Sequence, residues 1–447
     1  MPLRSLRTGA AAGLVALATA AGLTSPATGP ALAATPTATT ATTATTADGV
    51  ERRPGDGGFG DTAVPLPDRG DDPVLTVVSS PDFMNADVGD VSGLARWDGV
   101  HNSINDRYVT ATGVVLDQLR AEEPDAVLVA GDLVEGHWGV DVDRTGIFGP
   151  VDTPARARAA VGRAGAFYFG AWARLFARHG LPLPHVAVGD HEIGDDPWPG
   201  GSFDLAAVPT YKRTFAEALV AARYARSHRP VGTPYAATSY WTALSPEVML
   251  VSVDVFDPRP AARAGRDGMR LDLTGAHLRW FRRTLAEGRE RFRWVVVQGH
   301  VPALGPVRTS GSSGLRLDDG PRSRMWRAMT SADVDLYLAG EVHDVTAIAR
   351  RGQPVQVTHG GLFAFGGTTY LRLDVFEDRL ELSTYGFDTR VDRDSGTLWQ
   401  TSEKRAVPRD LRYEPGRRLR GSAVLTPTGR LVTRSGDLAP ATELDGR

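Results

Sequence analysis

The sequence predicts an α/β fold. One observation indicates the class, and two more concern the size of the core and the source of stability. Short runs of β-branched and aliphatic residues alternate with segments of helical periodicity from about residue 74 onward. With 447 residues, 42% of them hydrophobic, the chain can bury a large core, as one large α/β unit or as two or three domains. It contains no cysteine, so its stability does not come from disulfides, and thiol catalysis is excluded.

The N-terminal segments are predicted to lie outside the folded unit. Residues 1–33 combine two early arginines, a short apolar run and the small-residue pattern Ala31-Leu32-Ala33, which is typical of a secretory signal peptide. The apolar run is too short for a comfortable membrane span. Residues 34–72 are rich in Thr and Ala and then in Gly, Asp and Pro, which predicts a disordered linker. We therefore expect a secreted protein with no stable membrane insertion after signal cleavage.

The strands and helices are expected within residues 73–390, followed by a C-terminal extension at 391–447. Buried strands are predicted at 74–78, 126–130, 185–188, 248–256, 294–297 and 334–339. Helical periodicity falls at about 106–122, 154–178, 211–227 and 274–290. The many arginines of the last of these helices are predicted to form a solvated face rather than a phosphate-binding patch. Strand pairs follow between 346 and 384, and the extension offers one more pair at 422–425 and 430–433.

Acidic or imidazole side chains follow five of the predicted strands. They are Asp82; Asp132; Asp190 with His191; His300; and Glu341 with His343. Each one taken alone fits an ordinary turn or a helix cap. Because the carboxyl ends of neighbouring strands converge on one edge of an α/β sheet, we expect these groups to share one crevice. Carboxylates and imidazoles without thiolates are the ligands of hard or borderline divalent metals, so the set predicts a metal site.

The order and spacing of these groups resemble the calcineurin-like metallophosphoesterase family, which includes the purple acid phosphatases. The resemblance covers about residues 75–348 and implies a four-layer αββα sandwich of two mixed β-sheets flanked by helices. The resemblance implies that residues 73–390 form a catalytic domain that hydrolyses a phosphomonoester or a phosphodiester. The reaction implied is attack of a metal-bound hydroxide at a binuclear site.

The resemblance also implies a role for each motif position. Asp132 resembles the ligand that bridges the two metals. At one metal it would be joined by Asp82 and His343, and at the other by Asp190, His300 and Glu341.

Two further residues are implied to act in catalysis, and one family ligand is missing. His191 would contact the phosphoryl group or protonate the leaving alcohol, and Glu192 would orient it. Met84 stands where the family has a histidine or glycine, and it cannot replace a histidine at a hard metal. Glu135, three residues after the bridging aspartate, is the candidate replacement ligand.

The ligand set is more acidic than the family pattern. Asp190 stands where asparagine is usual, and Glu341 stands where the last motif has its first histidine. Four carboxylates would bring about four negative charges against about four positive charges from two divalent ions. We therefore expect Mn, Fe, Mg or Ca in preference to Zn, and weaker attraction for dianionic monoesters than in the family generally.

Composition and absent motifs narrow the partners. The formal net charge is −3, with 50 basic and 53 acidic residues, so we expect no nucleic acid and a small phosphorylated substrate instead. The sequence contains no Gly-x-Ser-x-Gly, P-loop or dinucleotide fingerprint, which argues against a serine hydrolase and nucleotide cofactors. Two alternatives stay open: a non-catalytic descendant that binds metal or ligand, and a metal-dependent hydrolase of a non-phosphate bond. A binding protein would not need His191, and a substrate panel would separate the two hydrolases.

Overall fold

The computed structural model describes residues 72–83, 89–96, 106–136, 138–140, 146–258, 268–305, 314–361, 368–399, 404–413, 416–427, 429 and 431–439. The chain divides into residues 1–56 and 57–447, and all described residues belong to the second unit. The predicted signal peptide, the predicted linker up to residue 71, and Met84 lie outside the described residues.

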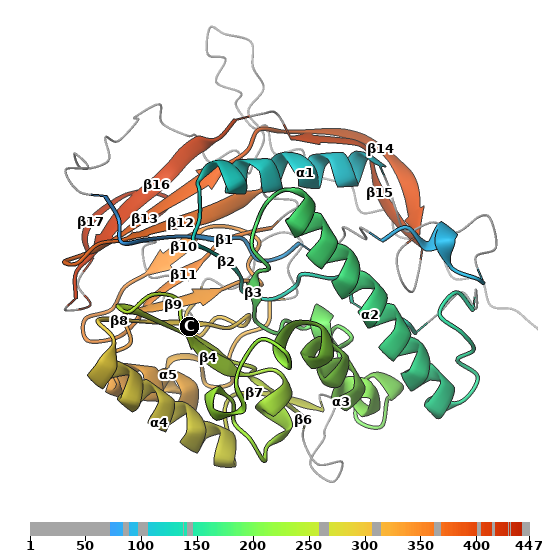
Figure 1. Ribbon diagram of the computed structural model, residues 1–447, viewed down its shortest axis with the longest axis horizontal. Helices are drawn as coiled ribbons and strands as arrows, with labels where there is room; N and C mark the ends of the chain where they lie inside the picture. Colours follow the sequence, from blue (N-terminus) through green and yellow to red (C-terminus); the bar gives the residue numbers. More distant parts are fainter. Residues whose placement is uncertain are drawn as a thin grey trace, which may run out of the picture. The chain divides into compact units, whose positions relative to one another are not determined.

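Seven strands form the first large sheet, called sheet A (Figure 1). Their spatial order is β17 (Leu431–Gly436), β16 (Arg418–Leu425), β13 (Leu380–Gly386), β12 (Thr369–Val375), β1 (Leu75–Ser79), β2 (Ala126–Val129) and β3 (His185–Val186). Strands β1, β2 and β3 are parallel, and the other neighbours are antiparallel. Sheet A is therefore mixed, with its parallel part formed by the first three strands of the described chain.

Six strands form the second large sheet, called sheet B. Their order is β10 (Thr346–Ile348), β11 (Val355–Thr358), β9 (Leu336–Ala339), β8 (Trp294–Gln298), β5 (Val248–Ser252) and β4 (Tyr240–Ala243). The four middle strands are parallel, and each edge strand is antiparallel to its neighbour. Sheet B is mixed as well.

The alternation of side chains along the strands explains how the two sheets pack. On β1 and β5, Leu75, Val77, Val248 and Leu250 point into one apolar cluster that joins both sheets. The residues in between point to the opposite faces, where Val78 packs in a cluster with residues of the helices. Because side chains on a strand alternate between its two faces, each sheet is buried on both sides.

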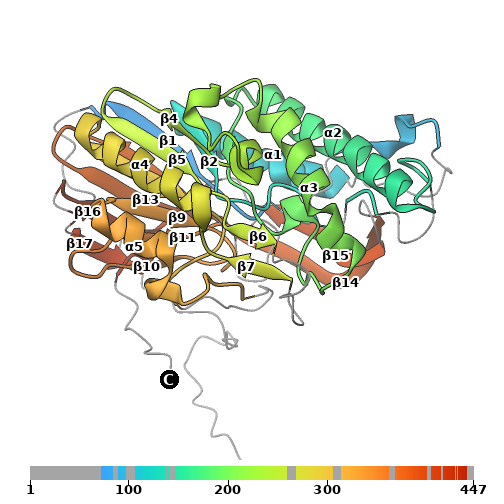
Figure 2. The same ribbon diagram turned by 90° about the horizontal axis from the view of Figure 1, so that it is seen from below.

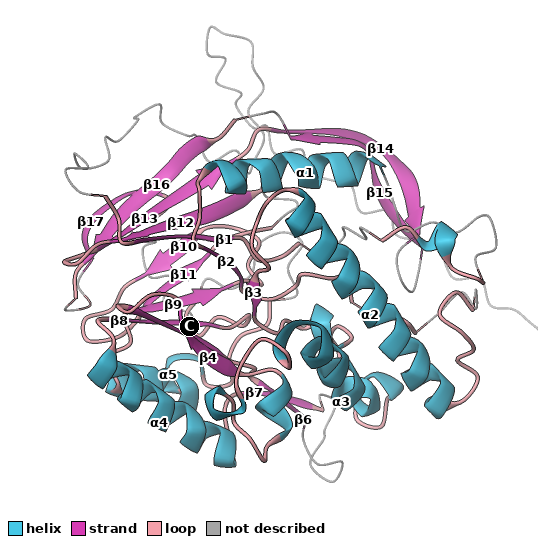
Figure 3. Ribbon diagram, in the orientation of Figure 1, coloured by secondary structure: helices cyan, strands magenta, loops and turns pink. Residues whose placement is uncertain are grey.

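Five α-helices complete the layers: α1 (Asp106–Ala121), α2 (Pro154–Arg178), α3 (Phe203–Phe215), α4 (Gly275–Arg291) and α5 (Arg324–Ser331). Helix α1 runs along sheet A, whereas α4 and α5 run along sheet B (Figure 3). Figure 2 shows α4 and α5 side by side in front of sheet B. The order of helix, sheet, sheet and helix confirms the four-layer α/β fold.

Helix α3 starts earlier than the sequence pattern predicts. It begins after Ser202, whose hydroxyl accepts a hydrogen bond from the Leu205 N–H, and it contains Pro209 in its interior. The expected helix at 211–227 is instead the end of α3 followed by short helices, because the Ser202 cap fixes the start. The short helices of the described chain are η1 (Val91–Gly93), η2 (His191–Ile193), η3 (Ala216–Val220), η4 (Arg226–His228), η5 (Pro234–Ala237) and η7 (Gly320–Arg322).

The segment after residue 390, expected as an extension, contributes two strands to sheet A. Strands β16 and β17 correspond to the pair predicted from the sequence, and they extend the sheet beyond β13. Two hairpins stand apart from the large sheets: β6 (Phe256–Pro258) with β7 (Met269–Leu271), and β14 (Thr389–Trp399) with β15 (Lys404–Tyr413). Among the described residues, no helix combines the length and the apolar character needed to cross a membrane.

Candidate metal centre

Six of the seven predicted metal ligands, all except Glu135, follow strands at the carboxyl ends of the parallel parts of the two sheets. Asp82, Asp132 and Asp190 follow β1, β2 and β3 of sheet A. The ligands from sheet B follow β8 and β9 and are His300, Glu341 and His343. All six side chains are buried, with at most 4% of their surface exposed. The structure brings these groups together, as their position after parallel strands predicts.

The ligand atoms form two triads. Oxygen or nitrogen atoms of Asp82, Asp132 and His343 lie within 4.8 Å of one another, and so do those of a second triad, Asp190, His300 and Glu341. Asp132 also approaches the second triad, because its Oδ2 lies 3.3 Å from His300 Nε2. It is therefore the carboxylate that lies between the two.

His300 is oriented by the end of β2. Its Nδ1–H donates a hydrogen bond to the Ala130 carbonyl oxygen at 2.9 Å, so in the neutral imidazole Nε2 is the free ligand nitrogen. This nitrogen lies 3.0 Å from Asp190 Oδ1 and 3.4 Å from Glu341 Oε2, in addition to Asp132. One imidazole nitrogen cannot satisfy three carboxylates, so the arrangement suits a shared cation.

The backbone at the site is held in an uncommon conformation. Asp82, Asp132, Glu341 and His343 have φ values of 61°, 57°, 70° and 58°. A left-handed backbone costs a residue other than glycine about 1–3 kcal/mol when the surroundings impose it, and such residues cluster at functional sites. Four of the six ligands that follow strands therefore share the same local strain, which supports a functional role for these strand ends.

Glycine is needed beside the site because of close packing. A Cβ atom on Gly189 would lie 2.0 Å from Asp132 Oδ1 and 2.7 Å from the Asp132 backbone nitrogen. Any side chain at this position would therefore displace the central carboxylate. In the Gly-Asp pair after β3, Gly189 is therefore needed for this close contact with Asp132, and Asp190 provides a donor carboxylate.

Burial and neighbouring charges shift the pKa values in opposite directions within the cluster. Burial, reinforced by the Asp132 carboxylate, raises the pKa of Asp82 and Asp190 well above its usual range. Burial also acts to raise the pKa of Asp132, but the imidazoles of His300, His191 and His343 outweigh it and lower this pKa. Asp132 is thus held in its ionised form more firmly than Asp82 or Asp190.

The donor set fits divalent cations. Carboxylate oxygens and imidazole nitrogens are suitable ligands, and each triad provides three of them. Within the described part of the chain, the buried atoms Asp82 Oδ2 and His343 Nδ1 have no hydrogen-bond partner. Since buried polar atoms are normally paired, the first triad has unused coordinating capacity.

His191 lies beside the central carboxylate with a defined ring orientation. Its Nδ1 accepts a hydrogen bond from the Gly136 N–H at 2.7 Å, so its Nε2 carries the proton in the neutral form. This Nε2 is 3.8 Å from carboxylate oxygens of Asp132, Asp190 and Asp195. Burial lowers the pKa of His191, but the surrounding carboxylates outweigh burial and raise the pKa well above 6.5.

The carboxylate of Glu192 binds backbone N–H groups beside Asp132. It accepts hydrogen bonds from the backbone N–H groups of Asp132, Leu133, Val134 and Gly189, at 2.7–3.3 Å. These bonds connect the Asp132 turn to the end of β3, so Glu192 holds this turn, and its part in orienting His191 stays a prediction. The loop conformations that expose these four N–H groups cannot be inferred from the motif.

The carboxylate of Glu135 lies beside His191. Its carboxylate is grouped with His191 and Asp195, and its Oε1 lies 3.6 Å from His191 Nδ1. It is not grouped with Asp82, Asp132 and His343, and its part as a replacement ligand there stays a prediction. The turn that follows Asp132 directs it toward His191.

Two acidic residues near the site were missed in the sequence. Asp195 and Asp196 follow η2, and both are grouped with Asp190. Burial and the neighbouring Asp195 carboxylate raise the pKa of Asp196 to about 6. The available signal was that Gly194-Asp195 repeats Gly189-Asp190 five residues later, but a Gly-Asp-Asp-Pro sequence is also typical of a turn.

A buried ion pair at the end of β5 was missed as well. Lys212 Nζ on α3 lies 2.7 Å from Asp254 Oδ2 and donates to the Phe256 carbonyl oxygen. Asp254 follows β5 as the ligands follow β8 and β9, but its charge is matched by the lysine. This strand-end carboxylate therefore anchors α3 to sheet B.

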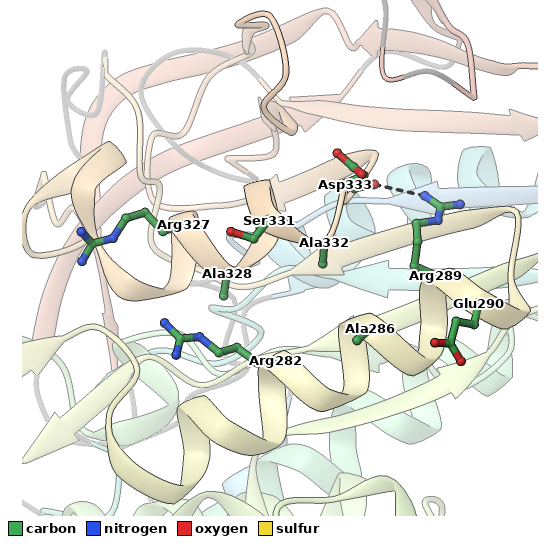
Figure 4. A pocket seen from close by; sticks show the side chains of 9 residues that line it. All are labelled: Arg282, Ala286, Arg289, Glu290, Arg327, Ala328, Ser331, Ala332 and Asp333. Atoms are coloured by element: carbon green, nitrogen blue, oxygen red, sulfur yellow. Dashed lines mark hydrogen bonds between the residues drawn. The ribbon is translucent and has the colours of Figure 1, made fainter.

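A groove between α4 and α5 lies apart from the metal centre (Figure 4). It has a volume of about 620 Å³ and includes Arg282, Arg289 and Arg327. Arg289 donates to the Asp333 carbonyl oxygen and to Asp335 Oδ2, so it serves the structure rather than an anion. The groove lies before the start of β9, whereas the metal ligands follow its end.

The chain matches one family model and resembles several solved structures. The model, described as calcineurin-like phosphoesterase, matches residues 88–345, which is more than half of the chain. A comparison with curated proteins finds no match. A dimetal phosphatase from Danio rerio is 14% identical with a TM-score of 0.46, and the alignment covers 75% of this chain and 99% of that one. A structure of PhoD is 15% identical with a TM-score of 0.49, covering 85% and 74%.

Proposed function

Because the chain belongs to the calcineurin-like phosphoesterase family, and is therefore a metal-dependent hydrolase of phosphate esters, we propose that it works with two divalent cations held on either side of Asp132. The observation that carries this proposal is the pair of donor triads joined by one buried carboxylate. Asp82 and His343 would complete one site, and a second triad would form the other: Asp190, His300 and Glu341. Two such ions activate a water molecule as the nucleophile and neutralise phosphoryl oxygens.

His191 is the residue proposed to act on the substrate directly. The Gly136 N–H holds Nδ1 as an acceptor, so Nε2–H is available to donate to a phosphoryl oxygen or to the leaving oxygen. The indole N–H of Trp138 donates to the His191 carbonyl oxygen at 3.0 Å and helps to fix this short helix. A histidine held from both sides is suited to positioning a substrate.

The experiment compares metal content and turnover. Protein purified without chelator should contain about two metal ions per chain, Mn, Fe, Mg or Ca rather than Zn, because four of the six donors are carboxylates. Model phosphomonoesters and phosphodiesters would be assayed with each metal. In the His191→Ala variant, turnover should fall by roughly 100-fold or more while the metal content stays unchanged. Stoichiometric Zn would contradict the metal assignment, and no turnover of any ester with any metal would contradict the catalytic one.

Export is part of the proposal and rests on the sequence of residues 1–33. If this segment is a signal peptide cleaved after Ala33, the mature protein should begin at Ala34. Mass spectrometry of protein recovered from the medium of the producing cells would test this. Recovery only inside the cells, with Met1 still present, would contradict it.

A further inference from the structure

Asp195 places a carboxylate beside Nε2 of His191, the nitrogen proposed to donate to the substrate. Asp195 does not belong to either donor triad. Its Oδ1 lies 3.8 Å from His191 Nε2, and its side chain keeps 15% of its surface exposed. The other two carboxylates at this distance, Asp132 and Asp190, belong to the proposed metal sites, where cations would balance their charge. The carboxylate of Asp195 therefore lies beside the nitrogen through which His191 would contact the substrate.

The backbone around Asp195 fixes the place of this charge. Asp195 has a φ of 74°, and its N–H donates to the Asp190 carbonyl oxygen at 2.8 Å. Its Oδ1 accepts a hydrogen bond from the Asp196 N–H at 2.8 Å. A Cβ atom on Gly136 would lie 2.4 Å from Asp195 Cβ, so the His191-binding turn leaves room for this side chain only because it has glycine there. The carboxylate is thus positioned by the same two turns that position His191.

We propose that Asp195 is a specificity-determining residue that makes the site favour phosphodiesters, which carry one negative charge, over phosphomonoesters, which carry two. This inference rests on the proposed function. A monoester is mainly dianionic at pH 8, because the second pKa of a phosphate group is about 6. A fixed negative charge beside Nε2 repels the additional charge of the monoester, and the effect is strong because the site is mostly buried.

The test compares the wild-type protein with Asp195→Asn, both loaded with metal in the same way. Asparagine keeps the shape of the side chain and tolerates a left-handed backbone, so mainly the charge changes. At pH 8, kcat/KM for p-nitrophenyl phosphate relative to bis(p-nitrophenyl) phosphate should rise about tenfold in the variant. An unchanged ratio, with equal metal content, overturns the inference.

The matched control is Asp333→Asn. Asp333 also has a left-handed backbone, with a φ of 47°, but it precedes β9, whereas the metal ligands of this strand follow it. This variant should leave the ratio of the two kcat/KM values unchanged. An equal rise in both variants would mean that Asp195 has no specific part in discrimination.

A binding measurement separates this inference from the proposed function. Orthophosphate, a dianion at pH 8, should bind about tenfold more tightly to Asp195→Asn than to the wild type in calorimetry, and this requires no turnover. If neither ester is hydrolysed, the proposed function fails, but a tighter phosphate complex would still support the role of Asp195. Equal binding to both proteins, or binding to neither, overturns it.

The wild-type protein provides a second arm in case the variant does not fold. Because the Asp195 side chain is 15% exposed, raising the ionic strength should screen part of its charge and increase the relative rate on the monoester. A ratio that does not respond to salt would overturn the electrostatic basis of the inference.

Discussion

At the scale of single residues, backbone conformation and hydrogen bonds fix the positions of the donor atoms. Four predicted ligands adopt a left-handed backbone, and His300 is tied to the Ala130 carbonyl oxygen. Glu192 adds four hydrogen bonds from backbone N–H groups around Asp132. The positions of the donor atoms are therefore set by the surrounding turns before any cation binds.

The first prediction concerns Gly189. In Gly189→Ala the new Cβ would meet Asp132 Oδ1 at 2.0 Å, so the central carboxylate must shift and the bound metal should fall from about two ions to fewer than one. Metal analysis of purified protein measures this. The control is Gly93→Ala, where a Cβ meets no atom within 4 Å and the metal content should not change. Full metal occupancy in Gly189→Ala would show that Asp132 does not hold the cations.

Part of this site could be predicted from single residues and part could not. Asp82, Asp132, Asp190, His300, Glu341 and His343 each follow a strand, and the convergence of strand ends predicts their proximity. Glu135 and Asp195 lie in loops and Glu192 lies in the short helix η2, where the direction of a side chain depends on the local loop geometry. For that reason the contacts of Glu192 with backbone N–H groups and of Glu135 with His191 could not be predicted, and Asp195 was missed.

At the scale of elements, long periodic segments were predictable and capped ends were not. Apart from β4, the strands of both sheets and helices α1, α2 and α4 appear near their predicted positions, because burial on one or both faces leaves a clear pattern. Helix α3 starts earlier because Ser202 caps it. The pairing of Lys212 with Asp254 joins elements 42 residues apart in sequence, and no local pattern indicates it.

The second prediction concerns His277, where α4 packs against η5. Its ring stacks on Tyr235 with centroids 4.1 Å apart, and among the described residues neither ring nitrogen has a hydrogen-bond partner. Burial first, and then Lys212, lower the pKa of His277 to about 3, while Asp257 opposes this. The folded state therefore favours the neutral imidazole. The contribution of His277 to the free energy of unfolding is lost as the pH falls below 6.5, the ordinary pKa of histidine.

We expect this residue alone to reduce the free energy of unfolding by about 2 kcal/mol between pH 8 and pH 5. His277→Phe keeps an aromatic ring in the stack and removes the titration. Urea unfolding gives the free energy of unfolding of the variant minus that of the wild type. This difference should be about 2 kcal/mol larger at pH 5 than at pH 8. The same difference at both pH values would show that His277 is not a buried neutral group.

At the scale of the whole molecule, the metal centre joins the two sheets. Sheet A provides three aspartates and sheet B provides His300, Glu341 and His343, while an apolar cluster fills the space between the sheets. Without cations, four buried carboxylates lie close together, which opposes the packing of the sheets. Metal removal should therefore weaken the fold as well as the activity.

The third prediction tests this coupling. A chelator should lower the melting temperature of the wild-type protein, and adding metal back should restore it. In Asp190→Asn the cluster has one carboxylate fewer, so the metal-free protein should melt a few degrees higher than the metal-free wild type. Its metal affinity should be lower at the same time. Scanning calorimetry with and without chelator measures both changes. A metal-free variant that melts lower than the metal-free wild type would contradict the repulsion argument.

The position of β1 in sheet A also matters during synthesis. Leu75 pairs with Val375 on β12, so the strand that carries Asp82 lies between β2 and a strand made 300 residues later. The nascent chain cannot close sheet A around Asp82 until residue 375 has left the ribosome. His343 and Glu341 also emerge late. Complete metal sites can therefore form only after most of the polypeptide has been made.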